Sequence, residues 1–119
     1  MNLSNEALRI AEASHKAGGD GAHFIPMLLI RRSSLEVKLG RADDAAFDAT
    51  RALTLLQGTP HGKFSGTLGR AYLSLGYALR AEGRRDEAQR NFASAAEHLE
   101  DTLGLDHPET RSARELSHL

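Results

Sequence analysis

A pattern of glycine, acidic residues and small apolar residues that occurs twice constrains the fold of this chain more than any other feature. Gly83 is followed by two acidic residues and then by Ala88, Phe92 and Ala95 at steps of four and three. The same order begins at Gly40 and continues through Ala45, Ala49 and Ala52. Steps of four and three place side chains on one side of a helix. The sequence therefore predicts two similar helices, each entered through a glycine turn.

The residues before Gly83 predict a partner for the second of these helices. Tyr72, Leu75 and Leu79 also recur at three and four residue steps, which predicts a helix with one apolar side. Gly76 is small where this helix would cross the next one closely, and Gly83 stands where it must end in a left-handed conformation. We therefore expect an antiparallel pair of helices.

This pair resembles a tetratricopeptide repeat (TPR), whose pattern is an aromatic residue, Leu-Gly, Ala, a turn glycine and then Ala-x3-Phe-x2-Ala. The residues that carry the resemblance are Tyr72, Leu75, Gly76, Ala78, Gly83, Ala88, Phe92 and Ala95. The two copies are 43 residues apart, from Ala45 to Ala88. Because a standard repeat has about 34 residues, the helices or linkers are expected to be longer. Residues 103–110 resemble the linker of the kinesin-light-chain type of repeat.

The resemblance implies an all-α fold, an α-α superhelix or TPR solenoid of about two and a half helical-hairpin repeats in a single domain. We expect a partial repeat at 1–20, a degenerate repeat at 21–60, a well-matched repeat at 61–103 and a C-terminal capping helix within 104–119. The six expected helices are 4–17, 23–39, 42–57, 64–82, 86–103 and 107–118.

The last of these helices has its own start signals. Asp106 is expected as its N-cap, Pro108 in its first turn, and Glu109 reaching back as in a capping box. Its apolar side would consist of Ala113, Leu116 and Leu119.

Composition excludes several classes of function. The 15 basic and 16 acidic residues give a net charge of -1, so no chain-wide attraction to nucleic acid or anionic lipid is expected. Without cysteine there is no disulfide, thiolate nucleophile or Cys-ligated zinc. No secretory signal or apolar run of about 20 residues is present. We expect a cytoplasmic protein that contacts neither membrane nor nucleic acid.

No group of residues predicts catalysis. Gly58–Lys63 has three residues between its glycines where a phosphate loop has four, and Phe64 follows where Ser or Thr would hold magnesium. The acidic pairs lie at helix starts, where the helix dipole explains them. A hydrolase using His61 or His107 with a nearby carboxylate has the least support. We expect no enzyme, metal or cofactor.

The TPR resemblance implies a concave groove lined by the first helix of each repeat. The groove positions carry over to Arg70, Leu73, Tyr77, Arg80 and Ala81 in one repeat and to Met27, Ile30, Ser34, Val37 and Lys38 in the other. The Lys and Asn that clamp a chaperone's terminal carboxylate in part of this family are absent here. The resemblance therefore implies a non-enzymatic interaction module or scaffold that binds an acidic, partly apolar peptide or helix of a partner protein in a mixed apolar and basic groove.

Two alternatives remain open. In the first, these groove residues serve the fold and not a ligand: Arg80 and Lys38 merely offset the negative ends of their helices, and Met27 and Ile30 pack against an N-terminal helix. In the second, the chain is a self-assembling, homo-oligomeric adaptor or a regulatory domain of a larger signalling protein. Self-association would bury apolar residues at both ends of the stack. These residues are Leu8, Ala11, Leu116 and Leu119.

Overall fold

The computed structural model describes residues 24–58 and 65–118, and within these ranges it consists of five α-helices without a strand. They are α2 (Phe24–Lys38), α3 (Ala42–Gln57), α4 (Gly66–Ala81), α5 (Arg85–Leu103) and α6 (Pro108–Ser117). The all-α prediction is confirmed, and the observed ends lie within two residues of the predicted ones. The helix expected over 4–17 lies outside the described residues.

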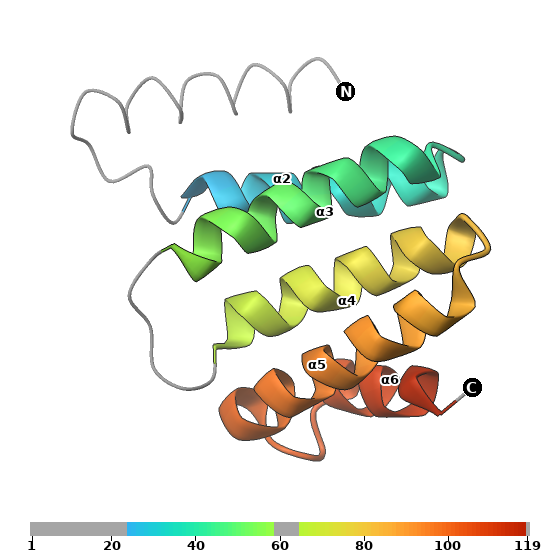
Figure 1. Cartoon of the computed structure of the whole chain (residues 1–119). Helices are drawn as coiled ribbons and strands as arrows, with labels where there is room; N and C mark the ends of the chain where they lie inside the picture. The colour runs from blue at the N-terminus through green and yellow to red at the C-terminus, as the bar shows by residue number, and fades with distance from the viewer. Residues whose placement is uncertain (1–23, 59–64, 119) are drawn as a thin grey trace.

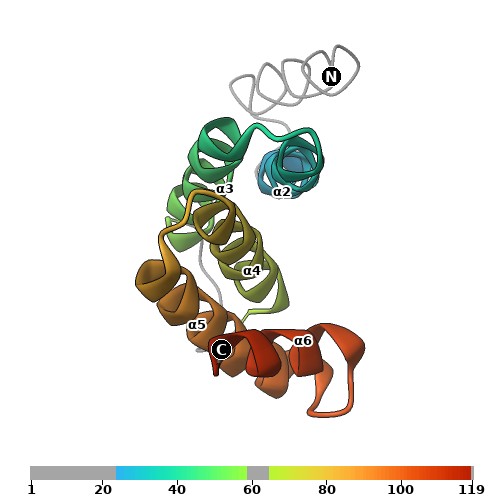
Figure 2. The ribbon, with the colours of Figure 1, turned by 90° about the vertical axis from the view of Figure 1, so that its right-hand side faces the viewer.

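The helices stack in chain order, and each runs antiparallel to the one before it (Figure 1). Each packs on its successor, and α2 also contacts α4. Figure 2 shows the result as two layers, with α2, α4 and α6 on one side and α3 and α5 on the other. We call α2, α4 and α6 the inner helices. They run in the same direction (Figure 1), and they form a bent row with α4 in the middle (Figure 2).

The two predicted glycine turns have the same geometry. Gly40 and Gly83 have φ angles of 77° and 82°, in the left-handed region where a side chain is strained. In the first turn Arg41 N donates to Glu36 O at 2.8 Å, and in the second Arg84 N donates to Leu79 O at 2.9 Å. Both α2 and α4 therefore end in the same glycine motif, which reverses the chain.

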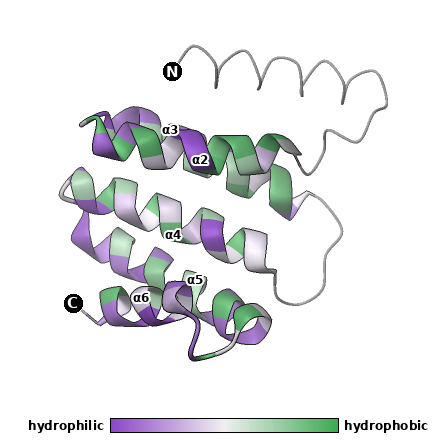
Figure 3. Cartoon of the chain, turned by 180° about the vertical axis from the view of Figure 1, so that it is seen from behind, coloured by the Kyte–Doolittle hydropathy of each residue, from purple (hydrophilic) through white to green (hydrophobic). Residues whose placement is uncertain are grey.

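The core consists of small clusters between successive helices. The first lies among α2, α3 and α4 and contains Ile25, Leu29, Ala52, Leu53, Leu56, Leu68 and Ala71. The others lie among α4, α5 and α6, where Ala95, Ala96, Leu99 and Ala113 form one cluster and Leu79, Ala88 and Phe92 another. In Figure 3 hydrophobic and hydrophilic residues alternate around the helices, as expected when each helix buries one side.

Glycines allow α4 to lie close to α5. A Cβ atom added at Gly76 would lie 2.6 Å from Cε1 of Phe92, and one at Gly69 would lie 2.9 Å from Cδ2 of Leu99. The close crossing predicted at Gly76 is therefore present, and the space left by the missing side chain is filled by an aromatic ring.

The start of α6 differs from the prediction. His107, not Asp106, is the N-cap, and its Nδ1 accepts a hydrogen bond from Glu109 N at 3.1 Å. The Glu109 side chain does not close a capping box, because its Oε2 accepts from Arg70 Nε of α4 at 2.9 Å. An imidazole nitrogen thus takes the place of the expected carboxylate, while Pro108 begins the helix as predicted.

Candidate binding surface

The predicted groove residues lie on two inner helices, α2 and α4, but their environments differ. Met27, Ser34 and Lys38 of α2 are exposed, as are Arg70 and Arg80 of α4. Ile30, Leu73 and Tyr77 are half-buried. The sequence therefore placed these residues on the correct helices, and their contacts decide which of them form a site.

A cavity of about 280 Å³ lies between α2 and α4, and we call it the first cavity. Its walls are Ser34, Val37 and Lys38 of α2 with Ser74 and Tyr77 of α4. All three α2 residues and Tyr77 were predicted from the repeat pattern. Ser74 was not, although it precedes Tyr77 by one helical turn and so shares its side of α4.

Tyr77 is held in place by aromatic contacts. Its ring meets the ring of Phe92 edge to face, with the centroids 5.4 Å apart. The guanidinium carbon of Arg80 lies 5.3 Å from the Tyr77 ring centroid and 5.9 Å from that of Phe92, within the range of cation–π attraction. These contacts fix the wall of the first cavity that α4 provides.

The other predicted residues serve the fold more directly. Arg70 forms an ion pair with Glu109 that joins α4 to α6. Ile30 packs against the first core cluster, and Leu73 packs against both of the others. Met27 is 45% exposed and does not line the first cavity. The structure therefore brings Ser34, Val37, Lys38 and Tyr77 together in the first cavity, and the other predicted groove residues do not line it.

A buried polar cluster lies between α2 and α3. Arg32 donates to both carboxylate oxygens of Asp48 at 2.7 Å, and Ser33 Oγ donates to Ala45 O. Glu36 is only 5% exposed, and burial together with a hydrogen bond to Asp48 raises its pKa to about 8. Burial alone would raise the pKa of Asp48, but hydrogen bonds from Arg32 and Glu36 hold it below its usual value.

The proton on Glu36 has a structural reason. If both side chains were ionised, neither could donate a hydrogen bond to the other. Glu36 Oε1 is buried without a hydrogen-bond partner, so a negative charge on this carboxyl group would be poorly compensated. A protonated Glu36 can donate to Asp48 instead. Arg32 and Ser33 stand where the TPR pattern prefers Leu and Gly, which is why the repeat at 21–60 was predicted to be degenerate. Their partners lie on the next helix, so this cluster was missed.

A mixed-charge edge forms where the two glycine turns lie side by side. Asp43, Asp44, Glu82 and Arg84 line one hollow there. A hydrogen bond with Asp43, together with burial, raises the pKa of Glu82. Arg84 forms an ion pair with Glu87 at 2.7 Å. Asp43 at the start of α3 thus interacts with Glu82 at the end of α4, while Glu87 at the start of α5 pairs with Arg84.

The residues considered for catalysis have other roles or lie outside the described ranges. His107 caps α6 through Nδ1, and Glu87 is paired with Arg84. Gly58 ends α3, whereas the rest of the segment compared with a phosphate loop, including His61, lies outside the described residues. Within residues 24–58 and 65–118 no three His, Asp or Glu side chains are grouped to hold a metal ion.

The alternative of a homo-oligomer requires exposed apolar residues at the two ends of the helix stack. Leu116 of α6 points inward, because it packs against the cluster of Leu79, Ala88 and Phe92. It is therefore not part of an apolar outer face at the C-terminal end. Leu8, Ala11 and Leu119 lie outside the described residues.

Comparisons of the chain with protein-family models, curated proteins and solved structures found no match. None of the described helices has both the length and the apolar character needed to cross a membrane. The candidate surface must therefore be interpreted from its own geometry.

Proposed function

We propose that this chain is a non-enzymatic interaction module, a short TPR-like solenoid that binds a peptide or helix of a partner protein across its inner helices. Support comes from the antiparallel helix pairs and from the matching turns at Gly40 and Gly83. A helix pair of this kind needs neighbours to bury its apolar side, and stacks of such pairs present an extended surface.

The first cavity is the observation that carries the proposal. Its volume of about 280 Å³ can accommodate a side chain of a larger partner. Val37 and the Tyr77 ring offer apolar contact, and the hydroxyls of Ser34 and Ser74 offer hydrogen bonds. Lys38 adds a positive charge for a carboxylate. An apolar residue next to an acidic one fits this lining.

The test uses a phage-displayed library of random peptides, selected against the full chain. We expect Tyr77→Ala to weaken the binding of the selected peptides by about tenfold, because it removes an aromatic wall. Lys38→Glu should weaken it several-fold through charge reversal at an exposed position. Circular dichroism of each variant checks that the helices remain folded.

Arg90→Glu is the matched control for Lys38→Glu. Arg90 is exposed on α5, outside the inner layer, and has no ion-pair partner among the described residues. The proposal is wrong if the library yields no binder, or if the selected peptides bind the Tyr77→Ala and Lys38→Glu variants as well as they bind the Arg90→Glu variant.

A further inference from the structure

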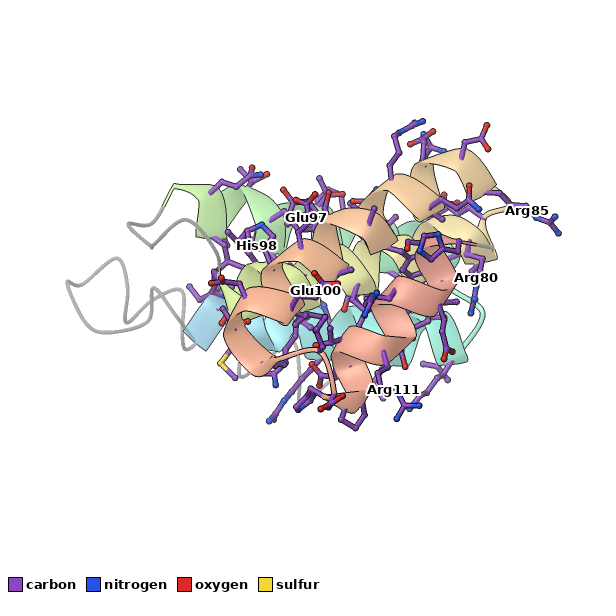
Figure 4. The ribbon with its side chains drawn as sticks, turned by 90° about the horizontal axis from the view of Figure 1, so that it is seen from below. Arg80, Arg85, Glu97, His98, Glu100 and Arg111 are labelled. Atoms are coloured by element: carbon purple, nitrogen blue, oxygen red, sulfur yellow. The ribbon has the colours of Figure 1, made fainter. Side chains whose placement is uncertain are left out.

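A second cavity, of about 410 Å³, lies between the end of α4, the start of α5 and the end of α6. Its floor is formed by Ala88 and Phe92, and Leu116 of α6 forms a wall. Arg80 and Arg85 also line it. In Figure 4 Arg80 and Arg85 lie at the same end of the molecule, where α6 ends and α5 begins. The second cavity thus combines an apolar floor with two cationic groups.

No carboxylate among the described residues neutralises the two arginines of the second cavity. Within the described residues no carboxylate forms an ion pair with Arg80 or Arg85, and no acidic side chain lines the cavity. The nearby arginines do have partners: Arg84 pairs with Glu87, and Arg114 pairs with Glu100 at 3.1 Å. The positive charge of the second cavity is therefore available to an anionic group from outside.

The stability of α5 does not explain why an arginine stands at position 85. It is the first residue of α5, where the positive end of the helix dipole disfavours a cation by about 0.3–1 kcal/mol. Arg80, by contrast, lies in the last turn of α4, where a cation is favourable, and is held over the rings of Tyr77 and Phe92. One arginine is thus fixed by stacking, and the other stands at a position that its own helix disfavours.

The two cavities lie next to each other on α4. Tyr77 lines the first cavity, and the guanidinium of Arg80, which lines the second, lies over its ring. A chain segment that crosses Tyr77 and Arg80 would meet both cavities. Resting on the proposed function, we infer that the second cavity binds an acidic stretch of the same partner segment, with an apolar side chain on the floor and a carboxylate between Arg80 and Arg85.

The test uses the peptides that the random library yields against the wild-type chain. We expect them to contain Asp or Glu beside an apolar residue, and to bind less tightly as the salt concentration rises. Arg85→Glu should weaken binding by about tenfold or more, and Arg80→Gln should also weaken it. Replacing the acidic residue of a selected peptide by Lys should restore binding to the Arg85→Glu variant.

The variants separate binding from folding. Arg85→Glu replaces a cation by an anion at a helix start, so it should not destabilise α5, and weaker binding cannot be attributed to unfolding. Arg90→Glu, on the same helix, makes the same charge change outside both cavities and should bind like the wild-type chain.

Three results would overturn the inference. If Tyr77→Ala and Lys38→Glu weaken binding while Arg85→Glu and Arg80→Gln do not, the second cavity is not used, although the proposed function stands. Binding that falls equally in Arg85→Glu and Arg90→Glu would show only a general effect of charge. A library without any binder would contradict both the inference and the proposed function.

Discussion

The ring of Phe92 lies against Gly76 and beneath the guanidinium of Arg80. The first contact is so close that a Cβ atom at Gly76 would lie 2.6 Å from Cε1 of the ring. The second places the Arg80 guanidinium carbon 5.9 Å from the ring centroid. Phe92 is 2% exposed, so its ring cannot move without disturbing both neighbours. This residue therefore links the packing of α4 on α5 to the candidate surface.

Gly76→Ala should destabilise the protein despite the higher helix propensity of alanine. The added methyl group would overlap the Phe92 ring, and overpacking of this kind usually costs about 1–3 kcal/mol. Chemical denaturation would measure the loss. The control is Gly66→Ala in the first turn of α4, where the nearest atom, Thr102 Oγ1, is 3.3 Å away and belongs to an exposed side chain. An equal effect of the two substitutions would contradict the packing argument.

At the scale of single residues, the sequence predicted part of the candidate site. The repeat spacing placed Ser34, Lys38 and Tyr77 on the inner helices, and the first cavity contains all three. The same spacing also selected Arg70, whose ion pair with Glu109 could not be foreseen because the partner is 39 residues away in the chain. A periodic pattern gives the side of a helix on which a residue lies, but not the partner that it meets there.

The polar cluster between α2 and α3 contains a carboxyl group, that of Glu36, whose pKa is raised. Because the pKa of Glu36 is raised from 4.5 to about 8, the folded protein keeps this proton when the unfolded chain has released it. Stability therefore falls as the pH rises from about 4.5 to about 8. The pKa of Asp48 is lowered, so its stabilising contribution is present above pH 3.8 and is lost as the pH falls through its folded pKa.

Glu36→Gln should remove the loss of stability on the alkaline side. An amide can donate to Asp48 at any pH, as the protonated carboxyl does. Near pH 5 the variant and the wild-type chain should be similarly stable. At pH 9 the variant should be more stable by at least about 1 kcal/mol, because a shift of one pKa unit corresponds to about 1.4 kcal/mol. Denaturation curves between these pH values measure the difference.

All other titratable groups are common to both proteins, so their effects on stability cancel in the comparison. The charged groups that face Glu36 are Arg32 on its own helix and Asp44 and Asp48 on α3. A difference in stability that does not change with pH would show that Glu36 is ionised throughout.

The elements themselves were largely predictable, for local reasons. Gly40 and Gly83 end α2 and α4 because few other residues adopt a positive φ, and this preference is visible in the sequence. The start of α6 was predicted less well, since Asp106 and His107 are adjacent and both can accept a backbone hydrogen bond. Only the backbone geometry decides which of two neighbouring acceptors reaches the helix.

On the scale of the whole molecule, most packing is between helices adjacent in the chain. Leu29→Ala should therefore have a regional effect. Leu29 is fully buried in the first core cluster, and its truncation should cost about 2–5 kcal/mol. Hydrogen exchange should accelerate most in α2 and α3 and least in α5 and α6, as in a stack stabilised by nearest neighbours.

Leu35→Ala is the control, because Leu35 lies on the same helix but is 46% exposed. It should change both stability and exchange little. If Leu29→Ala instead accelerated exchange equally in all five described helices, the molecule would unfold as one cooperative unit, and the picture of loosely coupled neighbours would be wrong.

The space shared by Gly76 and Phe92 also limits how the protein can evolve. A larger residue at position 76 requires a smaller one at position 92, so the two positions should covary among descendants of this sequence. Because Phe92 is also the floor of the second cavity, such an exchange would deepen that cavity and change which side chains it accepts. Selection for a new partner and selection for helix packing would then act on the same pair of residues.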